Sequence, residues 1–72
     1  MHSLAELRRA KGWSQKQLAS RLELSTGAIG NYEAGIRTPR LSTAKAIARL
    51  FNVRVDDLAF RTPEQEPRAS AS

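Results

Sequence analysis

The sequence predicts an all-α fold, because three observations agree. Apolar residues recur at helical spacing in five short segments, and no segment alternates as a half-buried strand would. Serine precedes each of the first three segments at the N-cap position, and glycine follows the first and the third. Two segments, at about 15–22 and 26–34, are so close together that they predict a helix-turn-helix unit.

The first segment covers about residues 4–11. Ser3 and Glu6 have the spacing of a capping box, in which each side chain binds the backbone N–H of the other residue. Gly12 is expected to end the helix in a left-handed conformation. We expect Trp13 to pack in the core, because a helical domain this small needs large apolar anchors.

The second and third segments form the predicted helix-turn-helix unit, with Ser14 and Ser25 as their N-caps. Between them, Glu23 stands where such a turn often requires positive φ. That conformation costs a non-glycine residue on the order of 1 kcal/mol, so either the turn opens slightly or the domain tolerates the strain. Small Ala19 lets the two helices approach. The apolar residues are spaced to share one small core: Leu18, Leu22, Leu24, Ile29 and Tyr32.

Two further helices are predicted after Pro39, which cannot continue a helix. The fourth covers about 41–51 and is followed by Asn52 as a left-handed cap. The fifth covers about 55–60, with two aspartates in its first turn, where the helix dipole favours negative charge. Apolar side chains near this fifth helix are expected to complete the core: Val53, Val55 and Leu58.

From Arg61 onward the chain is polar and proline-containing. We therefore expect one domain at 1–61 and a disordered tail or a truncated linker at 62–72. Residues 1–61 hold eleven Lys and Arg against five Asp and Glu, a net charge of +6. A small basic domain is suited to a polyanionic partner, although charge alone also fits an ordinary solvated surface.

Composition argues against several other functions. The chain has no cysteine and a single histidine, His2, so it lacks the residues of a cysteine nucleophile or a cysteine zinc site. We expect no enzyme activity, no metal and no cofactor, because no catalytic group of residues is present. No apolar run approaches the ~20 residues that span a bilayer, so we expect no membrane association and a cytoplasmic location.

With these residues laid out, the chain resembles the Cro/C1-type helix-turn-helix family, which includes phage repressors and many antitoxins. The resemblance runs from about Leu4 to Leu58. It rests on LRRAKGWSQKQLASRL and on NYEAGIRTP, whose E-x-G-x-R-x-P pattern is more specific than helical spacing. It implies a compact five-helix, lambda-repressor-like domain that contacts DNA with its second and third helices.

The resemblance implies which residues of the third helix contact bases. With Ile29 and Tyr32 facing inward, the outward residues are Thr26, Gly27, Ala28, Gly30 and Asn31. Asn31 can bind an adenine edge through two hydrogen bonds, and Thr26 and Ala28 can contact a base or its methyl group. Gly27 and Gly30 stand where relatives often carry long polar side chains. Three interpretations remain: close backbone approach to DNA, recognition of DNA shape, or simple tolerance.

Other positions are expected to contact phosphates. Gln15 begins the second helix, where unpaired N–H groups favour an anion, and in the family this residue sometimes also supports base contacts. Lys16 is expected to add attraction to the DNA backbone. Arg37, Thr38 and Arg40 lie on the loop that runs along the DNA backbone in the family. In the family, the two residues at the positions of Arg8 and Glu33 form a structural ion pair. The resemblance therefore implies the same role for Arg8 and Glu33 here.

The sequence therefore predicts a DNA-binding transcriptional regulator, more specifically a repressor, that uses helix 26–34 in the major groove. One short helix contacts too few base pairs, so we expect a homodimer formed through Leu58, Phe60 and their neighbours. The alternative is an antitoxin or protein-interaction module that binds a partner protein as well as, or instead of, double-stranded DNA.

Overall fold

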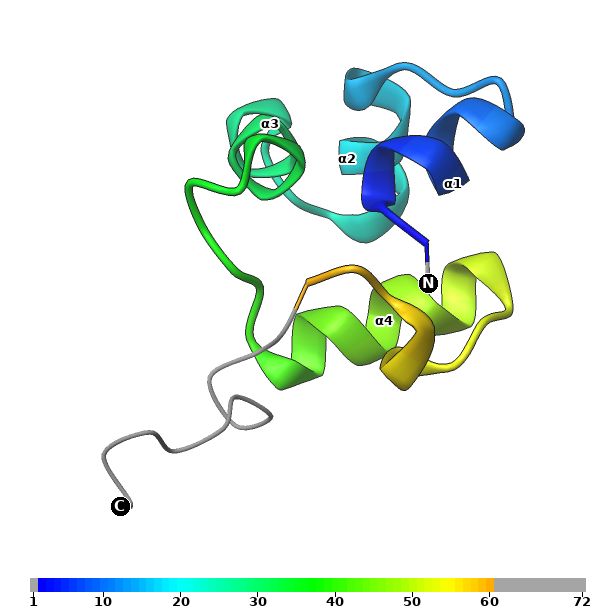
Figure 1. Cartoon of the computed structure of the whole chain (residues 1–72). Coiled ribbons are helices and arrows are strands. Elements are labelled where there is room, and N and C mark those ends of the chain that lie inside the picture. The colour runs from blue at the N-terminus through cyan, green and yellow to red at the C-terminus, as the bar shows by residue number, and fades with distance from the viewer. Residues whose placement is uncertain (1, 61–72) are drawn as a thin grey trace.

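The computed structural model describes residues 2–60, which fold into four α-helices and one short 3-10 helix (Figure 1). These elements are α1 (Leu4–Ala10), α2 (Gln15–Leu22), α3 (Thr26–Ala34), α4 (Leu41–Phe51) and the 3-10 helix η1 (Val55–Asp57). Residues 2–60 contain no strand beyond one isolated bridge. The all-α prediction is therefore confirmed. The predicted domain boundary between residues 61 and 62 lies outside the described residues.

Serine side chains cap the first three helices, as predicted from the sequence. The Oγ atom of Ser3 accepts from the N–H of Glu6 at 3.1 Å, and Ser14 and Ser25 make the equivalent bonds at 3.0 Å each. In α1 and α2 the reciprocal bond is also present, so both have complete capping boxes. These bonds satisfy backbone donors that a helix start leaves unpaired, and so fix where each helix begins.

Left-handed residues end the helices. Gly12 and Gly35 have φ of +74° and +76°, and Asn52 has φ of 55°. Glu23, in the turn between α2 and α3, has φ of 58° and ψ of 40°, so the turn stays tight and the domain tolerates the strain. The conformation lets the N–H of Leu24 donate to the carbonyl of Ala19 at 2.8 Å, which closes the end of α2.

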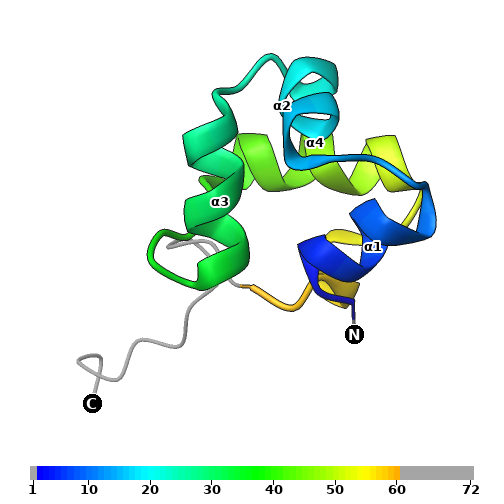
Figure 2. The ribbon, with the colours of Figure 1, turned by 90° about the horizontal axis from the view of Figure 1, so that it is seen from above.

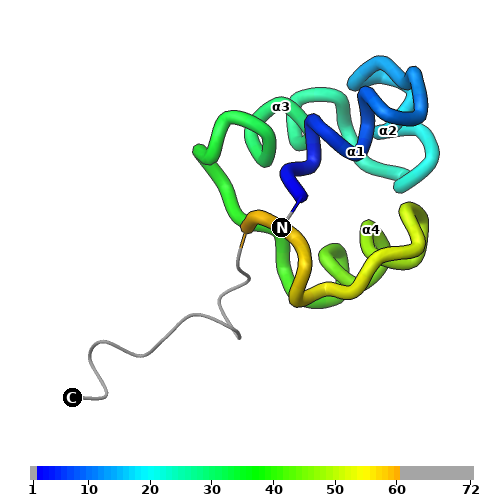
Figure 3. Tube along the Cα trace, turned by 45° about the vertical axis from the view of Figure 1, so that its right-hand side comes forward, coloured from blue at the N-terminus to red at the C-terminus, as the bar shows by residue number. Residues whose placement is uncertain are grey.

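The predicted fifth helix is wrong in extent. Only Val55–Asp57 is helical, as a 3-10 turn, and Leu58 has an extended backbone with ψ of 146°. The reason is a bridge to the N-terminal end of the chain. The N–H of His2 donates to the carbonyl of Asp57, and the N–H of Ala59 donates to the carbonyl of His2, both at 2.7 Å. Figure 3 shows these two segments side by side.

One small apolar core joins all the α-helices. Its buried members come from every α-helix and from the segment after η1: Leu4, Leu18, Ala19, Ile29, Ala44, Ile47, Ala48, Phe51 and Leu58. Other predicted core residues, among them Leu22, Leu24 and Tyr32, pack against it and are partly buried. Trp13 is also only partly buried. Its ring centroid lies 5.6 Å from that of Phe51, and the guanidinium of Arg21 lies 4.2 Å above it.

The core places α3 at one side of the molecule. In Figure 1, α3 is seen nearly end-on while α4 runs across the view below it, so the two helices cross steeply. In Figure 2, α1 and α2 both lie on the same side of α3, and the opposite side of α3 is free of other helices. This arrangement leaves one face of α3 open.

Candidate nucleic-acid interface

The position of α3 is fixed by its ends and by one deeply buried side chain. Ser25 caps its first turn, and Gly35 ends it. Ile29, near its middle, is completely buried, with 0% of its surface exposed. Burying a side chain of this size contributes roughly 1.5–3 kcal/mol. The inward face of α3 therefore anchors the helix, and the outward face is free for another task.

The predicted base-contacting residues lie along the outward side of α3, but they are not equally open. Thr26 and Gly27, in the first turn, are exposed. Ala28, Gly30 and Asn31 are half-buried. The structure therefore brings all five onto one helix, with the first turn the most accessible part.

The two glycines of α3 have different surroundings. A Cβ atom added at Gly27 would meet nothing within 4 Å. A Cβ atom added at Gly30 would lie 3.9 Å from Oε1 and 4.0 Å from Nε2 of Gln15, which is ordinary van der Waals contact. The fold therefore has room for a side chain at Gly27, whereas the amide of Gln15 already lies over Gly30.

Gln15 belongs to the first turn of α2 but contacts α3. Its Nε2 atom donates a hydrogen bond to Oε1 of Glu33 at 3.1 Å, and its side chain is half-buried. The sequence placed Gln15 among the phosphate contacts. It could not show this bond, because eighteen residues separate the two partners.

Arg8 and Glu33, expected as an ion pair, lie together between α1 and the end of α3. Arg8 Nε is 2.7 Å from Glu33 Oε2, Arg8 Nη2 is 3.2 Å from Oε1, and Arg8 Nη1 donates to the carbonyl of Trp13 at 2.8 Å. The two side chains are only 12% and 9% exposed. The paired, forked contact and its burial make this the strongest polar link between α3 and the rest of the domain.

The pKa values of this pair follow from the same contacts. Burial raises the pKa of the Glu33 carboxyl, but the hydrogen bonds from Arg8 and Gln15 outweigh burial and hold it below its ordinary value. The hydrogen bond to Glu33 raises the pKa of Arg8. Glu33 is therefore a fixed negative charge and a hydrogen-bond acceptor at neutral pH.

The loop after α3 carries the remaining predicted phosphate contacts. Arg37, Thr38 and Arg40 are exposed, and Pro39 between them is buried. The loop is tied to α3, because the N–H of Arg37 donates to the carbonyl of Asn31 at 3.2 Å. Arg40 occupies the N-cap of α4 without a side-chain cap bond. The structure thus places exposed Arg37 directly after the last turn of α3 and exposed Arg40 at the start of α4.

Other predicted site residues are more scattered. Lys16 is exposed on α2. Leu58, expected at a dimer contact, is only 3% exposed because it fills the core, whereas Phe60 is half-buried. Ile36 was not predicted as a site residue, yet 73% of its surface is exposed. The signal for Ile36 was its place in a glycine- and proline-bounded loop, where an apolar side chain has no helix face to join.

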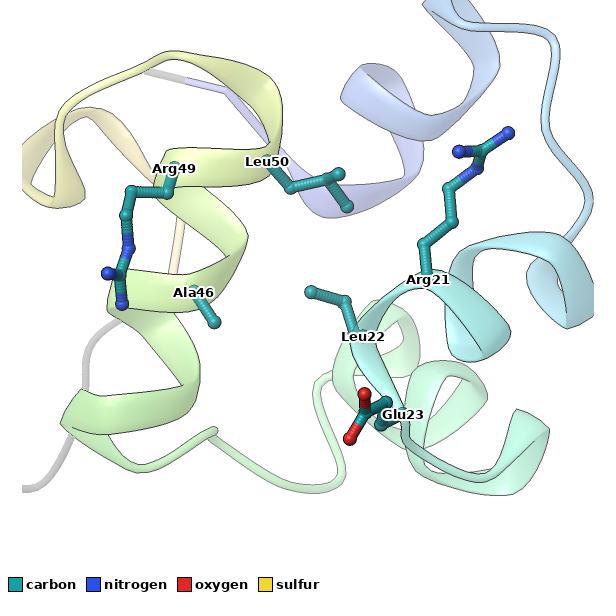
Figure 4. Close-up of a pocket in the computed structure, with 6 residues that line it drawn as sticks. All are labelled: Arg21, Leu22, Glu23, Ala46, Arg49 and Leu50. Carbon is teal, nitrogen blue, oxygen red and sulfur yellow. The ribbon is translucent and has the colours of Figure 1, made fainter.

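A pocket of about 420 Å³ lies elsewhere, between α2 and α4 (Figure 4). Leu22 and Leu50 point toward each other across it, while the charged groups of Arg21, Glu23 and Arg49 point in different directions. A catalytic or cofactor site needs polar groups that converge, and the groups lining this pocket do not.

Metal-binding clusters and membrane-spanning helices are both absent from residues 2–60. This range contains no group of three or more His, Cys, Asp or Glu residues that could hold a metal ion. None of its helices combines the length and the apolar character that crossing a membrane requires.

This arrangement defines a class of protein: a helix-turn-helix domain in which α3, the second helix of the unit, has an open face and is followed by exposed arginines. A family model described as helix-turn-helix matches residues 4–58, most of the chain. The chain belongs to the Cro/C1-type (XRE-like) helix-turn-helix family.

Three curated relatives are similar to this chain. The HTH-type transcriptional activator BcrR of Enterococcus faecalis is 38% identical over 76% of this chain and 27% of its own length. The HTH-type transcriptional regulator AnsR of Bacillus subtilis is 32% identical over 94% of this chain and 59% of its own. The HTH-type transcriptional regulator ImmR of Bacillus subtilis is 34% identical over 76% and 43%. The chain spans less than two thirds of each of these relatives.

Proposed function

We propose that this chain is the DNA-binding part of a transcriptional regulator and that it inserts α3 into the major groove of double-stranded DNA. The division of α3 into two faces carries this proposal. Ile29 and Glu33 bind one side to the domain, while Thr26 and Gly27 are exposed and make no contact that the fold needs. An open helix face of this kind fits the dimensions of the major groove.

Exposed cationic residues before and after α3 in the chain support the same docking. Arg37 and Arg40 follow its last turn, and Lys16 lies in the first turn of the neighbouring α2. Such groups would bind phosphates, which position the protein, while Asn31 and Thr26 would contact base edges. The family membership and the names of the three relatives, all transcriptional regulators or activators, support a DNA-binding regulator.

We further propose a homodimer on DNA, because one recognition helix buries little surface and contacts few base pairs. Phe60 is half-buried and lines a pocket of about 250 Å³ with Tyr32 and Ala34. Ile36, two residues after Ala34, is exposed. These side chains offer apolar surface to a second copy. Leu58 has none to offer, because it is buried in its own protomer.

The proposed regulatory action is repression, in the cytoplasm. A domain that occupies a promoter can exclude RNA polymerase without any contact beyond those to DNA. Repression therefore requires no binding surface other than the one for DNA. Activation, the role in the name of BcrR, requires an additional surface for the polymerase. Transcription from a promoter carrying the bound sequence, measured with and without the protein, distinguishes the two.

The experiment that tests DNA binding is selection of bound duplexes from a random library at about 150 mM salt, where non-specific binding is already weak. We expect enrichment of an inverted repeat whose half-site centres are about one helical turn apart. Light scattering of the protein with the selected duplex should give two chains per DNA.

Failure of this experiment has a defined meaning. If no sequence is enriched while the protein remains folded, sequence-specific DNA binding is wrong for this chain. The alternative, an antitoxin or protein-interaction module, would then be favoured. A selected sequence without an inverted repeat, bound by one chain, would contradict only the dimer.

A further inference from the structure

The amide of Gln15 lies against Gly30 of α3, within van der Waals contact of the place where a side chain at position 30 would begin. Gly30 has no side chain, and a Cβ atom built on it would touch Oε1 and Nε2 of Gln15 at 3.9 Å and 4.0 Å. Gln15 starts α2, so it reaches this place from the neighbouring helix. The outward side of α3 therefore carries a polar amide at Gly30, supplied by another element.

The orientation of this amide is fixed by Glu33. The nitrogen of the Gln15 amide lies 3.1 Å from Glu33 Oε1, and a carboxylate only accepts hydrogen bonds. If the amide were flipped, two acceptor oxygens would face each other. Glu33 cannot turn away, because Arg8 binds both of its oxygens, at 2.7 Å and 3.2 Å. Arg8 and Glu33 thus form a rigid support that holds the Gln15 nitrogen inward.

The fixed orientation determines what Gln15 offers to a ligand. One N–H is used by Glu33, which leaves Oε1 as an acceptor and the second N–H as a donor. A phosphate presents only acceptors, so it can use the N–H but is repelled by the oxygen. The major-groove edge of adenine presents a donor, N6–H, beside an acceptor, N7, and so matches both groups.

We infer that Gln15 of α2 supplies the base-contacting amide that α3 lacks at Gly30, that Glu33 positions it, and that it selects adenine at one base pair of each half-site. This inference rests on the proposed docking of α3 in the major groove. It gives Gly30 a role: the glycine has no side chain of its own to present, and the amide beside it arrives from α2. The opposing expectation is that Gln15 binds a phosphate and contributes equally on every sequence.

The experiment compares the sequence preference of the wild-type chain with that of Gln15→Ala, using the same random library and salt. Ser20→Ala, an exposed change on the same helix, is the matched control. We expect the wild type and the control to prefer adenine at a shared position. Gln15→Ala should lose that preference, by about 5- to 150-fold relative to the other bases, while preferences elsewhere persist.

A second variant tests the positioning role of Glu33. Glu33→Gln keeps the size of the side chain but places an amide beside Gln15, so that Gln15 can flip. We expect the adenine preference to fall toward that of Gln15→Ala at the same position. A melting curve shows that the variant is folded; a role confined to stability would change melting but leave the base preference at that position intact.

Each other outcome overturns a stated part of the inference. If Gln15→Ala weakens all duplexes equally, the residue is a phosphate contact. If it changes neither affinity nor preference, the residue faces solvent only. If Glu33→Gln retains the full preference, Glu33 does not position the amide. If the wild type enriches no sequence, the proposed function and this inference both fail, whereas enrichment unaffected by Gln15→Ala overturns the inference alone.

Discussion

The two helices of the helix-turn-helix unit are stabilised in different ways. α2 has a complete capping box, in which Ser14 and Gln17 exchange hydrogen bonds of 2.7 Å and 3.0 Å, and it contains no glycine. α3 has a single cap bond, from Ala28 to Ser25, and contains two glycines. Each glycine costs a helix interior up to about 1 kcal/mol relative to alanine. α2 is therefore favoured by its own sequence, and α3 depends on tertiary contacts.

This difference separates the residues that stabilise α3 from the residues that we propose contact DNA. Buried Ile29 and the Glu33–Arg8 pair hold the inward side of α3, whereas Thr26 and Gly27 on its outward side are exposed. The exposed residues on that face can be chosen for a ligand, even where they lower helix propensity. If the two helices differ in this way, a change to the support of α3 should have the largest effect on stability. A change in the exposed loop beside it should have the smallest.

Removing the tertiary support should affect α3 most. Arg8→Ala leaves the Glu33 carboxylate buried without its partner, and breaking such a pair costs about 3–5 kcal/mol. We expect a large loss in the free energy of unfolding, measured by urea denaturation. Arg9→Ala is the matched control, because the neighbouring Arg9 is exposed on the same helix. Equal stability of the two variants would show that the ion pair does not support α3.

Removing the cap of α2 should cost less. Ser14→Ala deletes the acceptor for the N–H of Gln17, and loss of an N-cap side chain typically costs ~1 kcal/mol, within a range of about 0.5–2 kcal/mol. The melting temperature should fall by a corresponding amount. Ser14→Thr keeps the hydroxyl and should restore most of the loss. A Ser14→Ala chain as stable as the wild type would show that α2 does not rely on its cap.

Replacing the open glycine of α3 should stabilise the domain. Gly27→Ala meets no atom within 4 Å, has no positive φ, and should gain up to about 1 kcal/mol in the free energy of unfolding. Gly35→Ala is the contrasting variant, because φ there is +76° and alanine is strained, so that change should destabilise. Urea denaturation of both chains checks the sign. A destabilised Gly27→Ala chain would show a structural need for that glycine.

Acid should weaken the support of α3 while leaving α2, which contains no carboxylate, without a direct effect. The pKa of Glu33 is lowered in the folded chain. Its contribution is therefore fully present above the ordinary glutamate pKa of about 4.3 and is lost as pH falls through the lower folded-state value. Thermal melts over this acid range should show a steeper loss for the wild type than for Glu33→Gln. Parallel losses would contradict the assignment.

The smallest effect on stability is expected outside both helices. Arg37 is exposed in the loop after α3, so Arg37→Ala should leave the melting temperature unchanged. If Arg37 binds a phosphate, DNA affinity should fall for all sequences alike. The log–log slope of affinity against salt should also become shallower by about 0.9 for each phosphate that the variant no longer neutralises. A change in sequence preference without a change in slope would assign Arg37 to a base instead.

Local rules explain which parts of the fold were predictable. Ser3 with Glu6, Gly12, and Asn52 each act within a few residues, and the structure has them as capping and left-handed positions. The predicted helix at 55–60 was wrong in extent because Leu58 forms a bridge to His2. These residues are more than fifty positions apart, and helical spacing cannot reveal such a contact. That bridge and the burial of Leu58 are two results of one tertiary contact.

In the candidate site, too, local features could be predicted and contacts between distant residues could not. The face of α3 could be predicted, because Ile29 and Tyr32 mark its inward side. The Arg8–Glu33 pair was predicted only through the family resemblance, and the Gln15 bond to Glu33 was missed altogether. Helical spacing relates residues on one helix, whereas Gln15, Gly30 and Glu33 are brought together by the crossing of two helices.

We propose that the outward face of α3 is the surface that meets DNA. Its most direct test is an NMR titration of the backbone amides with a duplex obtained by selection. We predict that the largest chemical-shift changes fall at residues 26–31, with further changes at Gln15 and Arg37. Changes confined instead to the pocket between α2 and α4, at Leu22, Ala46 and Leu50, would contradict the claim and place the DNA on another face.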